Sequence, residues 1–195
     1  MYNIHILSVG YSKFEKDTCL ANCTSTLIKS PDINIVVDTM TPWDKDKLVR
    51  ELKTHRVEPD NVDYLICTHG HSDHVGNNNL FLKAKHIVGH CVHFKDVFET
   101  TPFFENNGEF KIDGDNLKVF GTPGHTMDSI SVKVQTKEGV VVIAGDTFEK
   151  EDDENIWEHL AASENPDEQR KSRDYIRKMA DYIVPGHGNI FKVKK

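Results

Sequence analysis

One stretch of the sequence joins a short apolar run to a dense group of metal-ligand residues. The run Val62–Thr68 (VDYLICT) is predicted to be a buried β-strand. It is followed at once by the six residues His69–His74 (HGHSDH). His and Asp side chains supply the nitrogen and oxygen ligands that suit Zn²⁺. Because a buried strand is a rigid mount for the ligands that follow it, the fold is expected to hold a metal site at the end of this strand.

A single His or Asp after a strand is usually a cap or a surface residue, and one His-x-His pair would be weak evidence for a metal. Here ligand side chains crowd into six positions, and mutually repelling His and Asp residues have no good reason to do so without a cation. Further candidates lie downstream, at predicted strand ends or in loops. They are His125, Asp146 and His187. We therefore predict that His69 and His71 bind one metal and that Asp73 and His74 bind a second.

The remaining pattern predicts strands and helices in one continuous unit, a single domain over residues 1–195 without an accessory domain. The predicted strands are Ile4–Val9, Thr24–Ile28, Ile33–Val37, His86–Val88, Leu117–Phe120, Ile130–Val134, Val140–Ala144 and Ile183–Val184. Helices are predicted from Thr41 to about His55, from Glu154 to about Ala162 and from Pro166 to about Ala180. In the first helix, Trp43, Leu48 and Leu52 are expected to share one buried face. The pattern is that of a mixed α/β chain with packed sheets and outer helices.

The charge balance bears on the class of substrate. The formal net charge is -7, so the chain as a whole does not attract nucleic acid, and an RNA surface would need a local basic patch. The run Glu149–Glu154 is predicted to be a solvated acidic loop, which would repel a polyanion if it lined the site. The basic candidates near loops are Lys13, Lys16, Lys83, Lys85 and Lys95.

The four cysteines form no CxxC pair, and the N-terminus has no secretory apolar segment. Reduced thiols and a cytosolic or nuclear location are expected. Three other histidines could be functional, but each also has a common non-functional explanation. His90 and His93 flank Cys91 and could pass for a second ligand set, but such residues are more often neighbours of a strand end. His159 could be a general acid facing the cleft, but surface exposure is the commoner outcome.

The order of the motifs resembles the metallo-β-lactamase superfamily. HxHxDH at 69–74 is followed by Gly124-His125, by Gly145-Asp146 and by Gly186-His187-Gly188, and Asp38 follows the third predicted strand. The resemblance covers essentially the whole chain and implies a four-layer αββα sandwich with the site at one edge of its two sheets. It implies that His69, His71 and His125 bind a first metal, that Asp73, His74 and His187 bind a second, and that Asp146 bridges both. Two Zn²⁺ are implied, with iron or manganese as alternatives, and Asp38 would orient the ligands.

The chemistry implied is that of a dinuclear metal-dependent hydrolase. Two close metals lower the pKa of a shared water, so that a bridging hydroxide attacks a carbonyl carbon or a phosphorus atom. The metals then stabilise the charge that develops on oxygen. The resemblance gives Asp73 a catalytic role as well, in orienting the nucleophile or shuttling its proton.

Differences from other members of the superfamily narrow down the branch to which the chain could belong. Asp146 occupies the position where bacterial β-lactamases of this superfamily use Cys, and His71 occupies the position where the flavo-diiron branch uses Glu. Eight residues follow His187, which leaves no room for the helical substrate domain of glyoxalase II enzymes. The segment from His125 to Asp146 has no long arm of the kind that transfer-RNA 3′-processing enzymes carry. A bare catalytic core is therefore expected.

The C-terminal half resembles an animal, glyoxalase II-like branch of the superfamily. The residues that carry this resemblance are Ala144–Glu149, Glu151–Glu154, Trp157, Ser172-Arg173 and Val184–Gly188. The branch implies an endoribonuclease that cleaves the 3′ end of histone pre-messenger RNA, as a cytosolic and nuclear homodimer without a membrane partner. A glyoxalase II-like hydrolase of a small thioester stays open as the alternative, followed by an iron-dependent protein resembling persulfide dioxygenases. A non-catalytic binding protein is disfavoured because no ligand is missing.

Overall fold

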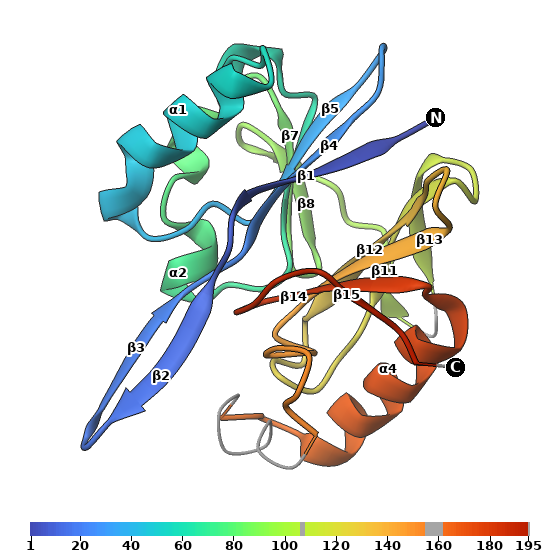
Figure 1. Ribbon diagram of the computed structural model, residues 1–195. Coiled ribbons are helices and arrows are strands. Elements are labelled where there is room, and N and C mark those ends of the chain that lie inside the picture. Colours follow the sequence, from blue (N-terminus) through green and yellow to red (C-terminus); the bar gives the residue numbers. More distant parts are fainter. Residues whose placement is uncertain (106–107, 155–161, 195) are drawn as a thin grey trace.

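The computed structural model describes residues 1–105, 108–154 and 162–194 (Figure 1). In this part of the chain, the larger of the two main β-sheets has seven strands in the order β1-β4-β5-β6-β7-β8-β9. Its strands are β1 (Asn3–Ser8), β4 (Ser25–Lys29), β5 (Asn34–Val37), β6 (Tyr64–Cys67), β7 (Lys85–Val88), β8 (Cys91–Phe94) and β9 (Val97–Phe98). The central strands β5, β6 and β7 run parallel to one another. The apolar run at 62–68 therefore forms a central strand, as its composition predicts.

The second main sheet has six strands among the described residues, in the order β10-β11-β12-β13-β14-β15. They are β10 (Glu109–Asp113), β11 (Leu117–Gly121), β12 (Ile130–Gln135), β13 (Val140–Gly145), β14 (Tyr182–Pro185) and β15 (Phe191–Lys192). The pair β13 and β14 is parallel, whereas the other neighbours are antiparallel. The carboxyl ends of β13 and β14 consequently meet at the same edge of the sheet.

Helices cover the outer faces of the two sheets. The helix α1 (Lys45–Thr54) lies on the first sheet and α4 (Pro166–Met179) on the second, while α2 (Ser72–Val75) is a single turn near the edge (Figure 1). Short 3₁₀ turns occur at Pro42–Asp44, Pro59–Asn61 and Asn78–Leu80. The layers follow the order helix, sheet, sheet, helix, which confirms the predicted αββα sandwich. None of the described helices combines the length and the apolar character needed to cross a membrane.

Alternating residues of the strands separate the core into layers. Ile35, Val37 and Ile66 point toward the second sheet and pack in the cluster between the sheets. Their neighbours Val36 and Leu65 point the other way and pack, with Leu48 and Leu52, under α1. On the far side, Ile176 of α4 packs against Val142 and Ile183. Both faces of each sheet are therefore covered, whereas the ends of the strands are not needed for this packing and can position functional side chains.

Trp43 does not share the buried face of the first helix, contrary to the expectation. Its side chain is 90% exposed, whereas Leu48 and Leu52 are fully buried. The reason is that Trp43 belongs to the 3₁₀ turn Pro42–Asp44, and α1 begins only at Lys45. Trp43 therefore does not follow the helical period that aligns the two leucines.

Residues 10–23, which gave no strand signal, form a β-hairpin. Its strands are β2 (Tyr11–Glu15) and β3 (Thr18–Asn22), and it projects away from the body of the molecule (Figure 1). Most of its side chains are exposed on both faces, so no alternation of polar and apolar residues marks it. The helix predicted from Glu154 to about Ala162, with Trp157 and His159, lies almost entirely outside the described residues.

Replacement of a buried leucine of α1 tests this arrangement. Leu52→Ala is expected to lower the free energy of unfolding by about 2–5 kcal/mol, because it leaves a cavity between α1 and the first sheet. Trp43→Ala is the control and is expected to change it by less than about 0.5 kcal/mol. Urea denaturation of both variants measures the difference. A Trp43 substitution as costly as that of Leu52 would show that the indole is buried after all.

Candidate metal centre

The predicted ligands lie where strands of both sheets end. The cluster His69–His74 begins two residues after β6, and α2 starts within it at Ser72. His125 lies in the connection between β11 and β12. Asp146 directly follows β13, and His187 comes two residues after β14. The structure brings all seven predicted ligands together, with the first sheet supplying His69 to His74 and the second sheet the other three.

Three histidines form the first group. The Nε2 atom of His69 lies 3.0 Å from Nδ1 of His71 and 3.1 Å from Nε2 of His125. His71 Nδ1 and His125 Nε2 are 2.9 Å apart. The carboxylate atom Oδ2 of Asp146 approaches to 3.7 Å from His69 Nε2 and 3.4 Å from His125 Nε2. These four residues present their ligand atoms to a common point.

Asp73, His74 and His187 form the second group. The Oδ2 atom of Asp73 is 3.8 Å from Nε2 of both histidines. Asp146 also faces this group, because its Oδ1 lies 3.2 Å from His74 Nε2 and its Oδ2 lies 3.1 Å from His187 Nε2. Asp146 therefore stands between the two groups, which is the position that the bridging role requires.

The donor set fits divalent metal ions. Two nitrogens bound to one tetrahedral Zn²⁺ are about 3.3 Å apart, close to the separations in the first group. Three ring nitrogens at such distances cannot all hydrogen-bond to one another, because each nitrogen is either a donor or an acceptor and at least two of the three therefore have the same role. In addition, three buried atoms, Asp73 Oδ2, His74 Nε2 and Asp146 Oδ1, make no hydrogen bond among the described residues, although the last two lie 3.2 Å apart. A cation at each position would satisfy these atoms, and the His and Asp ligands suit zinc, iron or manganese alike.

Asp38, which directly follows β5, contacts the predicted ligand His74 directly and the predicted ligand His69 through Thr68. Its Oδ2 lies 3.0 Å from His74 Nδ1, and its Oδ1 accepts a hydrogen bond from the Thr68 N–H at 2.8 Å. The Thr68 hydroxyl, which contacts both Asp38 oxygens, also lies 3.1 Å from His69 Nδ1. Asp38 thus orients two ligand rings, the work that the resemblance implied for it.

The position of His187 depends on its neighbours in the chain and in space. Its Nδ1 lies 2.9 Å from the backbone oxygen of Asn22 at the end of β3, which aims Nε2 at Asp146. Gly186 allows this approach, because a Cβ atom there would lie 1.8 Å from Asp146 Oδ1. A side chain at position 186 would therefore displace the residue that faces both groups.

The charges of the centre act strongly on one another. Burial holds the pKa of His69 well below its usual range. Burial also opposes protonation of His74, but the carboxylates of Asp146 and Asp38 outweigh it and raise the pKa of His74 well above that range. The same balance, led by Asp146, raises the pKa of His187 to about 9. Because metal ligands must be deprotonated, bound cations would take the place of these protons.

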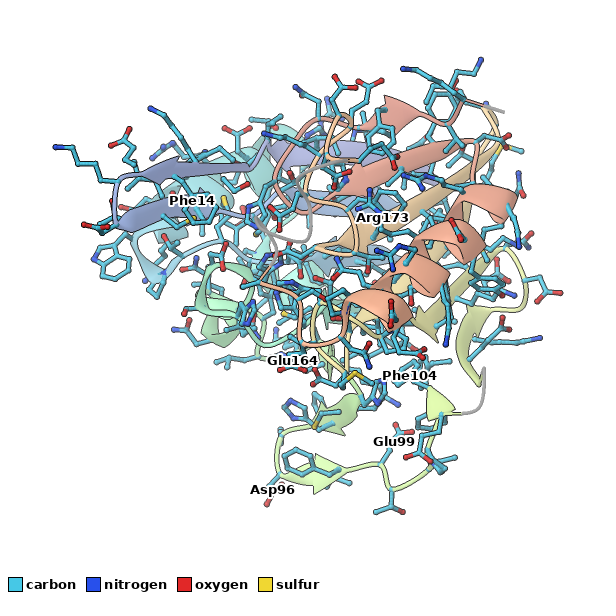
Figure 2. The ribbon with its side chains drawn as sticks, turned by 90° about the horizontal axis from the view of Figure 1, so that it is seen from below. Phe14, Asp96, Glu99, Phe104, Glu164 and Arg173 are labelled. Carbon is cyan, nitrogen blue, oxygen red and sulfur yellow. The ribbon has the colours of Figure 1, made fainter. Side chains whose placement is uncertain are left out.

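The acidic run Glu149–Glu154 is not a fully solvated loop, and this expectation was wrong. Glu149 is 2% exposed and Asp153 is fully buried, although Glu151, Asp152 and Glu154 are exposed. Asp153 is compensated by the buried Arg173 of α4 (Figure 2), whose guanidinium donates to both of its carboxylate oxygens at 2.9 and 2.5 Å, and Asp153 in turn accepts from the N–H of Glu149. A charge twenty residues away in the chain thus compensates one of the two buried carboxylates.

Glu149 is the residue of the centre that sequence reasoning missed. Its carboxylate lies within 4.8 Å of the ligand atoms of Asp146 and His187. Burial raises the pKa of Glu149 to about 7, and the charge of Asp146 adds to this. Its position three residues after Asp146 was the available signal, but the surrounding run of charges indicated a surface loop.

His90 and His93 do not join a ligand group among the described residues. The ring of His90 stacks on Phe104 at 5.4 Å, and that of His93 stacks on Phe98 at 4.8 Å.

The segment around Asp96 extends away from the body of the molecule (Figure 2). The four cysteines are free, with Cys23 and Cys67 buried and Cys19 and Cys91 exposed.

Comparison with known proteins agrees with this geometry. The family model described as the metallo-beta-lactamase superfamily matches residues 20–187. The chain belongs to the metallo-β-lactamase superfamily. It is 42% identical to metallo-beta-lactamase domain-containing protein 1 of Xenopus laevis, over 100% of this chain and 83% of that protein. The human protein of that name is 40% identical over 82% of this chain, and the match spans 59% of its length.

Solved structures share the fold of this superfamily member. A putative metallo-beta-lactamase from Thermotoga maritima superposes with a TM-score of 0.71 at 20% identity, over 98% of this chain and 99% of that one. An N-acyl homoserine lactone hydrolase superposes with a TM-score of 0.68 at 20% identity, over 95% of this chain and 91% of that one. The family and the two ligand groups together are those of a metal-dependent hydrolase with His and Asp side chains able to bind metal ions.

A rise in pH is expected to lower the stability of metal-stripped protein and to increase the stabilisation that bound metal provides. In metal-stripped protein, the raised pKa of His187 means that the folded state binds more protons than the unfolded state between pH 6.5 and 9. The stability of stripped protein should therefore fall as the pH rises through this window, with His74 acting in the same direction. Metal affinity should rise in that window, because fewer protons compete.

Thermal unfolding of stripped and Zn²⁺-loaded samples at several pH values measures this effect. The gap between their Tm values is expected to widen steadily from pH 6.5 to pH 9. A gap that stays constant or narrows would contradict the proton balance assigned to His74 and His187.

Proposed function

We propose that this metal-dependent hydrolase uses two metal ions to cleave the phosphodiester bond of RNA, at the 3′ end of histone pre-messenger RNA. The observation that carries the dinuclear part is the position of Asp146 between the two ligand groups. The RNA substrate is supported by the animal branch that the C-terminal half resembles, and by 42% identity with the Xenopus relative over the whole chain. The same resemblance supports a homodimer and a cytosolic and nuclear location.

The two ions, when bound, would supply Lewis acidity and a nucleophilic hydroxide at neutral pH. Thr68 and Asp38 orient the rings of His69 and His74, so the ligands need no rearrangement before reaction. Asp73 is 19% exposed at its side chain and faces the second ligand group, so its carboxylate is placed to orient the nucleophile or to take its proton. The exposed residues Gly70 and His71 mark the side from which a substrate reaches the centre.

The burial of Glu149 and Asp153 removes part of the objection to an RNA substrate. Sequence reasoning expected the whole acidic run to repel a polyanion, but Arg173 neutralises Asp153 inside the protein. The repulsion that remains comes from Glu151, Asp152 and Glu154, and Glu154 is itself paired with Arg177. The acidic run is thus a weaker barrier to RNA than its composition indicates.

Hydrolysis of a small thioester is the second candidate function. It is favoured because several of the candidate RNA-binding lysines are already paired with acidic side chains. Among the basic candidates, Lys13 pairs with Glu15, Lys83 with Asp60 and Lys85 with Glu99. These pairs reduce the positive potential on which RNA binding depends. A thiolate leaving group also needs little help from a general acid.

Side-by-side turnover of one metal-defined preparation separates the two candidates. Labelled histone pre-messenger RNA is expected to be cleaved, and a glutathione thioester to be left largely intact. Turnover of the thioester with untouched RNA would contradict the RNA proposal.

His71→Ala is expected to lower the turnover of whichever substrate is cleaved by at least about a hundredfold, since it removes a predicted metal ligand. Activity that survives this change in full would contradict the role of His71 as a ligand needed for turnover.

Metal analysis of the same preparation tests the cofactor. We expect two Zn²⁺ per chain, and iron or manganese in their place would keep the hydrolase proposal. A single iron together with oxygen uptake would instead favour the relationship with persulfide dioxygenases and contradict both hydrolase candidates.

A further inference from the structure

Glu149 contacts three parts of the chain that meet beside the metal centre. Its backbone oxygen accepts a hydrogen bond from the N–H of His187 at 2.9 Å. Its carboxylate Oε2 accepts one from the hydroxyl of Ser12, on β2, at 2.9 Å. Its own N–H donates to Oδ2 of Asp153 at 2.8 Å. One buried residue therefore joins a predicted ligand, the β2–β3 hairpin and the segment that precedes α4.

The backbone on both sides of Glu149 is firmly held. Arg173, 2% exposed, donates to the backbone oxygen of Thr147 at 2.9 Å as well as to Asp153. Its guanidinium carbon lies 4.2 Å from the ring centre of Phe148. The N–H of Gly186 in turn donates to the Phe148 oxygen at 2.9 Å. These contacts join α4 to the turn that carries His187 and hold the backbone from which the Glu149 side chain extends.

The Glu149 carboxylate borders the second ligand group without belonging to it. Its ligand atom lies within 4.8 Å of those of Asp146 and His187, a combination that could itself hold a metal, but it is not part of the group formed by Asp73, His74 and His187. Within the described part of the chain, its side-chain hydrogen bond comes from a neutral donor, the Ser12 hydroxyl. A buried carboxylate is costly unless positive charge is near, and His187 carries such a charge only while it is protonated. A cation held by Asp73, His74, Asp146 and His187 would supply that charge.

We propose that Glu149 is a positioning residue of the second metal position, and that its hydrogen bond with Ser12 couples occupancy of that position to the β2–β3 hairpin. The negative charge of this carboxylate, close to Asp146 and His187, stabilises a cation held there, and the cation stabilises the buried carboxylate. Because such coupling is reciprocal, binding of metal also steadies the hairpin. This inference rests on the proposed dinuclear centre but not on the identity of its substrate.

Titration of metal-stripped protein with Zn²⁺ by calorimetry tests the first half. Wild type is expected to bind two ions, and Glu149→Gln to weaken one binding step by about 10–100-fold while the other is unchanged, the range found for residues that orient metal ligands. Glu151→Gln, the same change at an exposed position of the same run, is the matched control and should titrate like wild type.

The outcomes of the titration are distinct. Identical binding by wild type and Glu149→Gln would overturn the role of Glu149 and leave the dinuclear centre intact. Fewer than two ions in wild type would contradict the dinuclear centre itself. Three ions in wild type, one of them lost in Glu149→Gln, would also overturn the inference, because Glu149 would then be a direct ligand.

Hydrogen exchange of residues 11–22 tests the coupling without any measurement of activity. Addition of Zn²⁺ to wild type is expected to slow exchange in this hairpin. The slowing should be clearly smaller in Glu149→Gln and in Ser12→Ala, a variant that alters only the half-exposed end of the contact. Equal slowing in wild type and both variants would overturn the coupling.

Discussion

Lone pairs and carboxylate charges that would repel one another converge at one edge of this protein. The donor nitrogens of His69, His71 and His125 lie within 3.1 Å of each other, and Asp146 faces both these rings and those of His74 and His187. Positive charge, from protons on the histidines or from bound cations, must balance such an arrangement, and a rigid frame must hold it. The rest of the structure can be understood as the means of meeting these two conditions.

The frame comes from both sheets. The first sheet ends in His69 to His74 and in Asp38, whereas the second ends in Asp146 and His187 and carries His125 in a connection between strands. A cation bound by both sets therefore joins the two sheets across the edge of the core. Since binding energy at such a site adds to folding energy, metal should contribute to the stability of the whole sandwich as well as to its chemistry.

Sequence reasoning predicted which side chains the structure brings together, because the signal for them is local. The cluster at 69–74 follows a strand whose apolar run is plain, and His125, Asp146 and His187 each stand in a short motif. The αββα layers followed from the resemblance, since strand and helix patterns alone indicated only a mixed α/β chain. The ligand roles of the individual residues stay predictions until metal is bound, although the structure gathers all of them.

What sequence reasoning missed depends on contacts between distant residues. The buried Asp153 is paired with Arg173, and a run of charges gives no sign of a partner twenty residues further on. The β2–β3 hairpin carries few buried residues, so no alternating pattern distinguishes it from a loop. Trp43 was misplaced because a 3₁₀ turn precedes α1, which shifts the start of the helical period.

The central claim is that the seven side chains hold two cations on either side of Asp146. Anomalous diffraction from crystals of the metal-loaded protein tests it most directly. The account predicts two anomalous peaks, one among His69, His71 and His125 and the other beside Asp73, His74 and His187, with the Asp146 carboxylate between them. A single peak, or a second peak away from these residues, would contradict it.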